Sequence, residues 1–273
     1  MNCGLIFGPQ NRGCLNLVVA IAIILKMCDN NNRLLAYNFR VPMAHFPLLP
    51  HLPLRQITSN IYEVKGTMKL FSIFRYSRNM HIIKCQEGVI LVNPVRVHEK
   101  TIESIQKIGS IKHIYKIGQF HNVDIPYYMD TFKPRLWKLK NDPSIPNYPA
   151  DELIESDQEL PPCHSKLRII KGLKVAEAVI VHPDQGGTLI SCDAFVNMGP
   201  DAMANWLTRN LTKLLPKPTL VGPNWIKFAK PTRDSLLECL EDEFENLITS
   251  HGPEIMGGAK PSLVSYITNM KIK

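Results

Sequence analysis

The order in which short apolar runs and amphipathic segments follow one another limits this chain to few folds. From Ile57 onwards four β-type runs come in succession, and Gly66 and Gly88 are expected at turns. Such runs predict a meander of antiparallel strands. Their sequences are ITSNIYEV, MKLFSIF, MHIIKC and GVILVNPV. Residues 97–108 then carry apolar side chains at helical spacing, Gly109 is expected to end that helix, and residues 111–117 return to strand.

The second half of the chain repeats this order of strands and helices. Residues 143–162 are rich in proline and are expected to form a surface loop. Strand candidates follow at 167–173, 177–183, 187–193 and 247–250, and helix candidates at 200–214, 233–245 and 259–270. Two such halves predict an α/β (α+β) domain in which two sheets pack face to face with helices outside. This is a four-layer αββα sandwich.

Composition excludes several classes of protein. Of the 273 residues, 45% are hydrophobic and 21% are charged, which rules out a disordered, collagen-like or coiled-coil chain. The net charge is +8, but much of the excess lies in residues 1–55, so the rest gives no strong nucleic-acid signal. The seven cysteines form no Cys-x-x-Cys pair. Reduced thiols in a cytoplasmic or organellar protein are therefore expected.

Residues 1–53 are expected to be an amino-terminal extension that precedes the folded domain at 54–273. Leu15 to Leu25 form an apolar run that is too short for a membrane span, which needs ~18 residues or more. Arg12 before the run leaves a targeting segment or an amino-terminal anchor open, beside a poorly ordered extension or a buried helix. Residues 36–54 contain four prolines and are expected to be an extended linker.

Three segments carry polar residues at predicted strand ends: IGQFHNVD (117–124), GGTLISCDAF (186–195) and ITSHGPEIMGGAK (248–260). In this order they resemble the metallo-β-lactamase fold superfamily. Members of that superfamily have a His-x-His-x-Asp-His turn, a later strand that ends in a metal-bridging Gly-Asp, and a final strand that ends in His followed by Gly. The resemblance covers residues 54 to 270. It implies the same αββα sandwich.

The first motif is incomplete in this chain. His121 matches its second His, but Gln119 stands at the first His, Val123 at the Asp and Asp124 at the last His. The family's middle His would fall near residues 172–173, which are Gly and Leu. Since valine cannot bind a metal or orient a water, the resemblance does not imply the two-metal hydrolysis of the family.

The later motifs match better. Asp193 corresponds to the bridging carboxylate, with Cys192 in place of the usual Gly, and His251 corresponds to the terminal His. The resemblance thus implies at most one zinc or iron ion, held by His121, Asp193 and His251. Three protein ligands and a water are the usual arrangement of catalytic zinc. Asp124 is a candidate fourth ligand, and Gln119 a candidate hydrogen-bond partner of the water or the substrate.

Plainer roles remain open for the same residues. Asp124 is expected to cap a short helix. Without His121 and His251 in the same order, Asp193 would also be interpreted as a helix cap. Cys192 is a soft ligand, a reactive thiol or a small buried hydrophobe. The aromatic residues of 127–137, which alternate with lysines and arginines, either stack bases or pack over the sandwich, and packing is favoured.

The first functional hypothesis is a hydrolase of a small ester or thioester. The alternative is a non-catalytic binding module, a pseudoenzyme that keeps the sandwich and holds a small-molecule ligand near Gln119, His121 and Trp137. A relative that processes nucleic acid is third. No membrane partner is expected apart from the amino-terminal anchor, and nothing in the sequence sets an oligomeric state.

Overall fold

The computed structural model describes residues 45–273, apart from residues 71–72, 200, 202, 215–216 and 273. The amino-terminal apolar run and residues 36–44 of the expected linker lie outside the described residues. Residues 45–54 are described and form neither helix nor strand. The N–H of Leu52 donates to the carbonyl of Lys65, which ties this segment to the first sheet. Within the described part of the chain, no helix has the length and apolar character to cross a membrane.

Seven strands form the first sheet, and they lie in the order of the chain. Neighbouring strands are antiparallel from the first to the fourth and parallel from the fourth to the seventh. They are β1 (Arg55–Gln56), β2 (Ile61–Leu70), β3 (Phe74–Cys85), β4 (Gly88–Val92), β5 (Ile111–Lys116), β6 (Arg135–Leu139) and β7 (Glu152–Ile154). Parallel strands need crossovers, which α2 (Glu99–Ile108) and α3 (Ile125–Phe132) supply.

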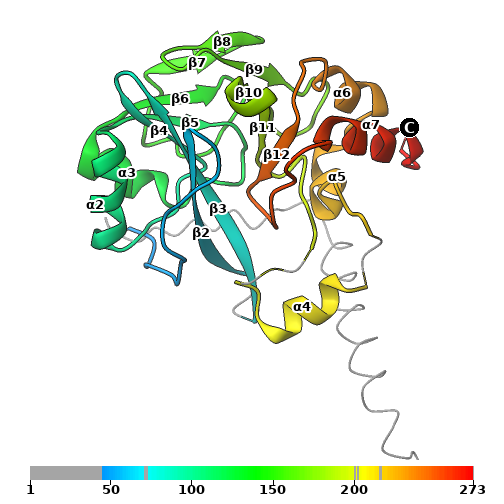
Figure 1. Cartoon of the computed structure of the whole chain (residues 1–273), viewed down its shortest axis with the longest axis horizontal. Coiled ribbons are helices and arrows are strands. Elements are labelled where there is room, and N and C mark those ends of the chain that lie inside the picture. Colours follow the sequence, from blue (N-terminus) through cyan, green and yellow to red (C-terminus); the bar gives the residue numbers. More distant parts are fainter. Residues whose placement is uncertain (1–44, 71–72, 200, 202, 215–216, 273) are drawn as a thin grey trace, which may run out of the picture. The chain divides into compact units, whose positions relative to one another are not determined.

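Five strands form the second sheet, in the order β12-β11-β10-β9-β8. They are β8 (Gln158–Leu160), β9 (Ser165–Ile169), β10 (Ala178–His182), β11 (Thr188–Ser191) and β12 (Asn246–Thr249). Only β11 and β12 are parallel, so their carboxyl ends lie side by side at one edge. The chain between them forms α4 (Trp206–Thr212), α5 (Pro223–Ala229) and α6 (Arg233–Glu238), and α7 (Ala259–Asn269) follows β12. Figure 1 shows this arrangement.

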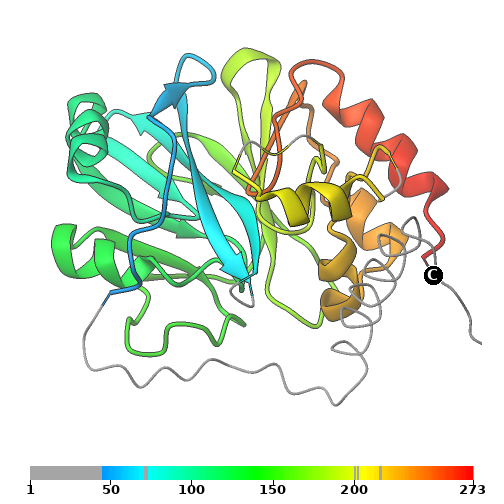
Figure 2. The same cartoon turned by 90° about the horizontal axis from the view of Figure 1, so that it is seen from below.

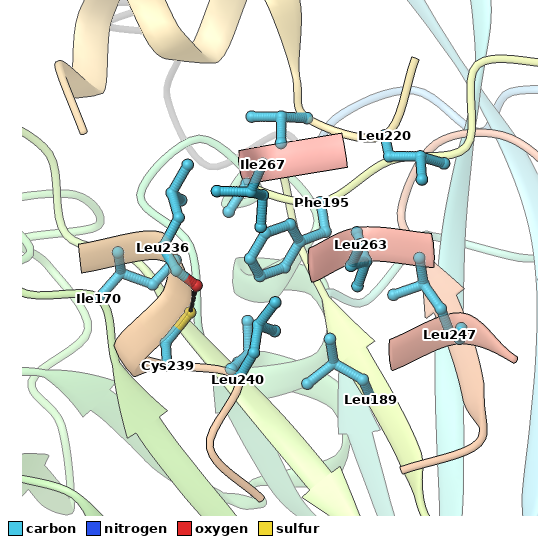
Figure 3. Packing of buried hydrophobic residues seen from close by; sticks show 14 of the residues in the cluster. Ile170, Leu189, Phe195, Leu220, Leu236, Cys239, Leu240, Leu247, Leu263 and Ile267 are labelled. Carbon is cyan, nitrogen blue, oxygen red and sulfur yellow. Dashed lines mark hydrogen bonds between the residues drawn. The ribbon is translucent and has the colours of Figure 1, made fainter. Parts of the chain in front are cut away.

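Three groups of buried apolar side chains separate four layers. The first lies between the seven-stranded sheet and its helices, and includes Ile105 of α2 and Tyr128 of α3. The second lies between the two sheets and includes Ile180. The third joins the five-stranded sheet to helices that include α6 and α7, through residues such as Leu236 and Leu263 (Figure 3). The predicted αββα sandwich is therefore confirmed (Figure 2).

Some predicted boundaries are wrong. Gly66 lies inside β2 rather than at a turn, and a Cβ there would approach Cγ1 of Val95 to 2.5 Å, so close packing explains the glycine. The proline-rich stretch 143–162 contains β7 and β8, not only a loop. Helices α4 and α6 are shorter than predicted, while β6 and α5 were not predicted. A Gly-Pro start at Gly222 and Pro223 is the signal for α5.

The aromatic residues that follow the His turn pack in the interior. Tyr128 and Phe132 of α3 lie on the outer face of the first sheet, as the packing interpretation predicts. Trp137 belongs to β6 and points between the sheets, where its indole N–H donates to His113 over 3.1 Å. Its side chain packs edge-on against Tyr115. The expected ligand pocket at Trp137 is therefore wrong, because core residues enclose that side chain.

Candidate metal centre

Three strand ends bring His121, Asp193 and His251 together at one edge of the sandwich. His121 lies in the loop after β5, while Asp193 and His251 follow the parallel neighbours β11 and β12. Because parallel strands end at the same edge, the last two residues start close together, and the β5 loop approaches from the facing sheet. The structure thus brings together the three residues that the sequence predicts as metal ligands.

The candidate ligand atoms are close enough to share one ion. Nε2 of His121 lies 3.3 Å from Oδ1 of Asp193 and 3.2 Å from Nε2 of His251, and the latter lies 3.1 Å from the same Oδ1. Ligands of a tetrahedral zinc, each ~2.0–2.2 Å from the metal, are about 3.3–3.6 Å apart. The three separations lie at or just below the short end of this range, so a small movement of the side chains would let the three atoms hold one ion.

His251 is held in a fixed orientation by the first sheet. Its Nδ1 donates to the carbonyl oxygen of Ser77 over 2.7 Å, which leaves Nε2 to face the other two ligands. Asn79, two residues further along β3, donates from Nδ2 to the carbonyls of Thr249 and Gly252. Gly252 has a φ of +93°, and a Cβ there would come within 1.8 Å of the carbonyl oxygen of Asn197. Glycine is thus required after His251.

A buried glutamate holds the backbone of Asp193 in place. Oε1 of Glu177 accepts the backbone N–H groups of Asp193 and Ala194, at 2.7 and 2.9 Å. Burial and the charge of Asp193 hold the pKa of Glu177 well above its usual value. Burial would raise the pKa of Asp193 as well, but His121 and His251 outweigh it and the pKa is lowered. Asp193 is the residue that carries the negative charge.

The two imidazoles differ in their surroundings. Burial lowers the pKa of His121, in spite of the nearby Asp193, which favours the neutral ring that a metal needs. Burial acts the same way on His251, but its hydrogen bond to Asp193 outweighs it and the pKa is raised. Nδ1 of His121 is buried and has no hydrogen-bond partner among the described residues.

A buried lysine shapes the loop that carries His121. Nζ of Lys116 donates to the carbonyl of Gly118 over 2.6 Å and lies 2.5 Å from Oδ2 of Asp142. Both side chains of this pair are buried. Gly118 itself lies against the facing sheet, since a Cβ there would approach Sγ of Cys192 to 2.4 Å.

Asp124 has a partner that the sequence did not reveal. Its carboxylate forms a buried ion pair with Arg78 of β3, and Arg78 also donates to the carbonyl of Pro94. Asp124 is the residue before α3, but its side chain makes no capping hydrogen bond, so the capping prediction is wrong. Among the described residues, Asp124 does not join the His, Cys, Asp and Glu side chains that gather at the candidate centre.

Among the described residues, Cys192 is a further candidate donor beside the three predicted ligands. His121, Cys192 and Asp193 offer ligand atoms that all lie within 4.8 Å of one another, and Sγ of Cys192 is 3.8 Å from Oδ2 of Asp193. The thiol is fully buried, and burial together with Asp193 raises its pKa. A thiolate ligand from Cys192 would fill the fourth position and close the site.

Solved structures with a likeness to this chain share one fold. The metallo-β-lactamase DIM-1 is 12% identical, with 81% of this chain and 98% of that chain covered and a TM-score of 0.58. A metallo-β-lactamase from Hirschia baltica is 13% identical, with 81% and 100% covered and a TM-score of 0.54. The described chain has the metallo-β-lactamase fold. A mutant flavo di-iron protein from Thermotoga maritima also shares it, at 14% identity, 81% and 62% coverage and a TM-score of 0.53.

Comparison with models of protein families gives no match, and comparison with curated protein sequences gives none either. The residues at which this chain departs from the expected motif include Gln119, Val123 and Leu173. Val123 is 39% exposed, and Leu173 packs against the core beneath α5 to α7. Oε1 of Gln119 accepts the backbone N–H of Ala176 over 3.2 Å, so the protein itself engages that oxygen.

Sequence reasoning missed the residues that support the centre. Ser77, Arg78 and Asn79 are consecutive buried polar residues of β3, and each contacts the loop of His251 or that of Asp124. A strand with one face in water alternates apolar and polar residues. The unbroken polar run between Tyr76 and Met80 was therefore a signal. Glu177 gave no comparable signal, because a lone acid before a strand is usually exposed.

Proposed function

We propose that this protein holds one zinc or iron ion through His121, Asp193 and His251 and hydrolyses a small ester or thioester. The observation that carries the proposal is the convergence of three donor atoms at separations of 3.1 to 3.3 Å, at the edge where three strands end. Two imidazoles and a carboxylate suit both zinc and iron. The metallo-β-lactamase fold adds support, since its relatives include metal-dependent enzymes.

A divalent ion at this position would act as a Lewis acid and lower the pKa of a water molecule toward neutrality. The chain's own residues supply the positioning. Ser77 holds the ring of His251 with Nε2 inward, and Glu177 holds the backbone of Asp193. Oδ1 of Asp193 faces both imidazoles, and Oδ2 lies 3.8 Å from Sγ of Cys192, so a molecule in the open position would share Oδ2 with that thiol.

A single ion is favoured over two. The position that would hold the second ion's carboxylate is Val123, which is exposed and has no donor atom. Arg78 adds a permanent positive charge nearby, which acts on both Asp193 and His121. A second cation would therefore meet a missing ligand and a like charge.

The alternative is a binding module in which Cys192 closes the coordination sphere. Its thiol lies near both His121 and Asp193, and a four-ligand site has no position for a substrate. Cobalt substitution separates the two proposals. A three-ligand site without Cys192 gives no thiolate-to-cobalt charge-transfer absorption, whereas coordination by Cys192 gives such a band, which Cys192→Ser removes.

The activity test uses the full chain loaded with zinc or with iron, and nitrophenyl esters and acyl thioesters as substrates. Metal-dependent hydrolysis is expected, with loss of at least about a hundredfold in His121→Ala and Asp193→Ala, since both remove a ligand. Lys174→Ala is a control on the exposed surface. Equal hydrolysis by the parent and both ligand variants, or none by a parent that holds the metal, contradicts the proposed hydrolase.

A further inference from the structure

Exposed apolar side chains lie on the β2–β3 hairpin, at the start of α4 and just after its end. Ile73 is 55% exposed, Trp206 is 77% exposed and Leu214 is 54% exposed. The hairpin and the helix are joined, because Nδ2 of Asn205 donates to the carbonyl of Ile73 over 2.6 Å. Figure 1 shows α4 beside the end of β3 that leads into this hairpin. We name Ile73, Trp206 and Leu214 the α4 patch.

One face of α4 combines the patch with positive charge. Trp206, Arg209 and Lys213 are exposed and follow one another at spacings of three and four residues, so they share a side of the helix. The opposite side is fixed to the sheet, since the buried Thr208 accepts the backbone N–H of Arg75 at its hydroxyl. An exposed tryptophan and two cations therefore face away from the domain.

The chain around α4 is free of acids over a long stretch. Residues 202–233 contain no Asp or Glu and six bases: Arg209, Lys213, Lys217, Lys227, Lys230 and Arg233. Asp201, which precedes them, is engaged by the protein, because its carboxylate accepts the backbone N–H groups of Ser77, Met203 and Ala204. The α4 patch thus lies in a positively charged part of the sequence.

We propose that the α4 patch binds the surface of an anionic lipid membrane. Tryptophan prefers the boundary between water and hydrocarbon, and aliphatic side chains such as Ile73 and Leu214 gain free energy when they enter it. Arg209 and Lys213 are placed to meet anionic headgroups. A nucleic acid would explain the cations and the tryptophan by stacking, but it offers no apolar environment for Ile73 and Leu214.

The test must separate this patch from the amino-terminal apolar run, which gives the full chain another route to lipid. Tryptophan emission makes the separation, since the chain has three tryptophans and the other two, Trp137 and Trp225, are 8% and 4% exposed. Vesicles of phosphatidylcholine and phosphatidylserine are added to the full chain. A blue shift of the emission and protection from acrylamide are expected, and Trp206→Phe should abolish both.

Charge variants test the headgroup contacts. Removal of both cations by Arg209→Gln with Lys213→Gln should weaken partition roughly thirtyfold, at about fivefold for each cation near an anionic surface. The matched control is Lys100→Gln with Lys107→Gln on α2, whose lysines are exposed and lie on another helix. The control should leave partition unchanged, and circular dichroism should show the same fold for all variants.

Two results would overturn the proposal. One is an unchanged Trp206 emission at vesicle concentrations that bind the full chain, since attachment would then come from elsewhere. The other is a response to a single-stranded RNA oligonucleotide with none to the anionic vesicles, which would identify a nucleic-acid surface. Ile73→Asn with Leu214→Asn gives a further check, because it should weaken binding to vesicles but would leave binding to RNA unchanged.

Discussion

At the scale of single residues, Glu177 fixes the position of the Asp193 backbone. Glu177→Ala removes the acceptor of two backbone N–H groups, so we expect a loss of about 2–6 kcal/mol in the free energy of unfolding, at ~1–3 for each group. Glu177→Gln keeps an oxygen acceptor and should lose much less. Urea unfolding of both variants measures the difference. Equal stability of the Ala and Gln variants would show that these hydrogen bonds do not support the site.

Asp124 gives a second prediction at this scale. Asp124→Asn breaks a buried pair with Arg78 and should cost about 3–5 kcal/mol in stability, while the metal content of the folded protein stays the same. Thermal unfolding and elemental analysis measure the two quantities. Loss of metal with full stability would instead make Asp124 a ligand.

The three candidate ligands could be predicted because each sits in a short motif at a strand end. The partner of Asp124 could not, since Arg78 is distant in sequence and pairs with it only when β3 lies beside the loop before α3. The support of Asp193 by Glu177 depends in the same way on the pairing of β10 with β11. Contacts between elements set these roles, and motif spacing does not encode them.

At the scale of elements, the buried pair of Lys116 and Asp142 holds the loop between β5 and α3. Lys116→Met leaves the buried Asp142 without its cation, with the backbone N–H of Ser144 as a remaining donor, and should cost about 3–5 kcal/mol. Adding Asp142→Leu should recover much of that stability, but not the hydrogen bonds that Lys116 gives to the loop of His121. The double variant should therefore fold with weakened zinc affinity, measured by competition with a chelator. Unchanged affinity would contradict this role of Lys116.

The loop after His251 is tied to β1 by a pH-dependent contact. The hydrogen bond from Arg55 lowers the pKa of Glu254 from 4.5 to about 2. Because the folded-state pKa is depressed, the contact stabilises the protein above the unfolded value and is lost as pH falls from about 4.5 to about 2. Melting temperatures of the parent and Glu254→Gln should differ at neutral pH and converge in acid. A difference that persists below pH ~2 would contradict this.

Element boundaries were predictable where the local pattern is strong. Strands β10, β11 and β12 lie close to their predicted ranges because each is a short run that is buried along its whole length, and helix α7 does because its buried residues recur every four positions. Strands β7 and β8 have three residues each and lie among prolines, so their formation depends on neighbouring strands rather than on local pattern.

At the scale of the whole molecule, each half of the chain forms a sheet with an apolar face that must be covered. The sandwich forms because the two faces cover each other. The buried residues between the sheets come from both halves, as they must if neither sheet can cover itself. The sequence could not predict that β3 reaches across to the end of β12, where Asn79 binds the backbone around His251. That contact joins the sheets at the edge that carries the centre.

The most direct test of the account is the amount of metal held by each chain. The full chain, purified with zinc and with iron supplements, is measured by native mass spectrometry and elemental analysis beside the triple variant His121→Ala, Asp193→Ala, His251→Ala. We predict close to one ion per parent chain and none in the variant. Two ions per parent chain, no ion, or one ion retained by the triple variant would contradict a mononuclear centre built from these three residues.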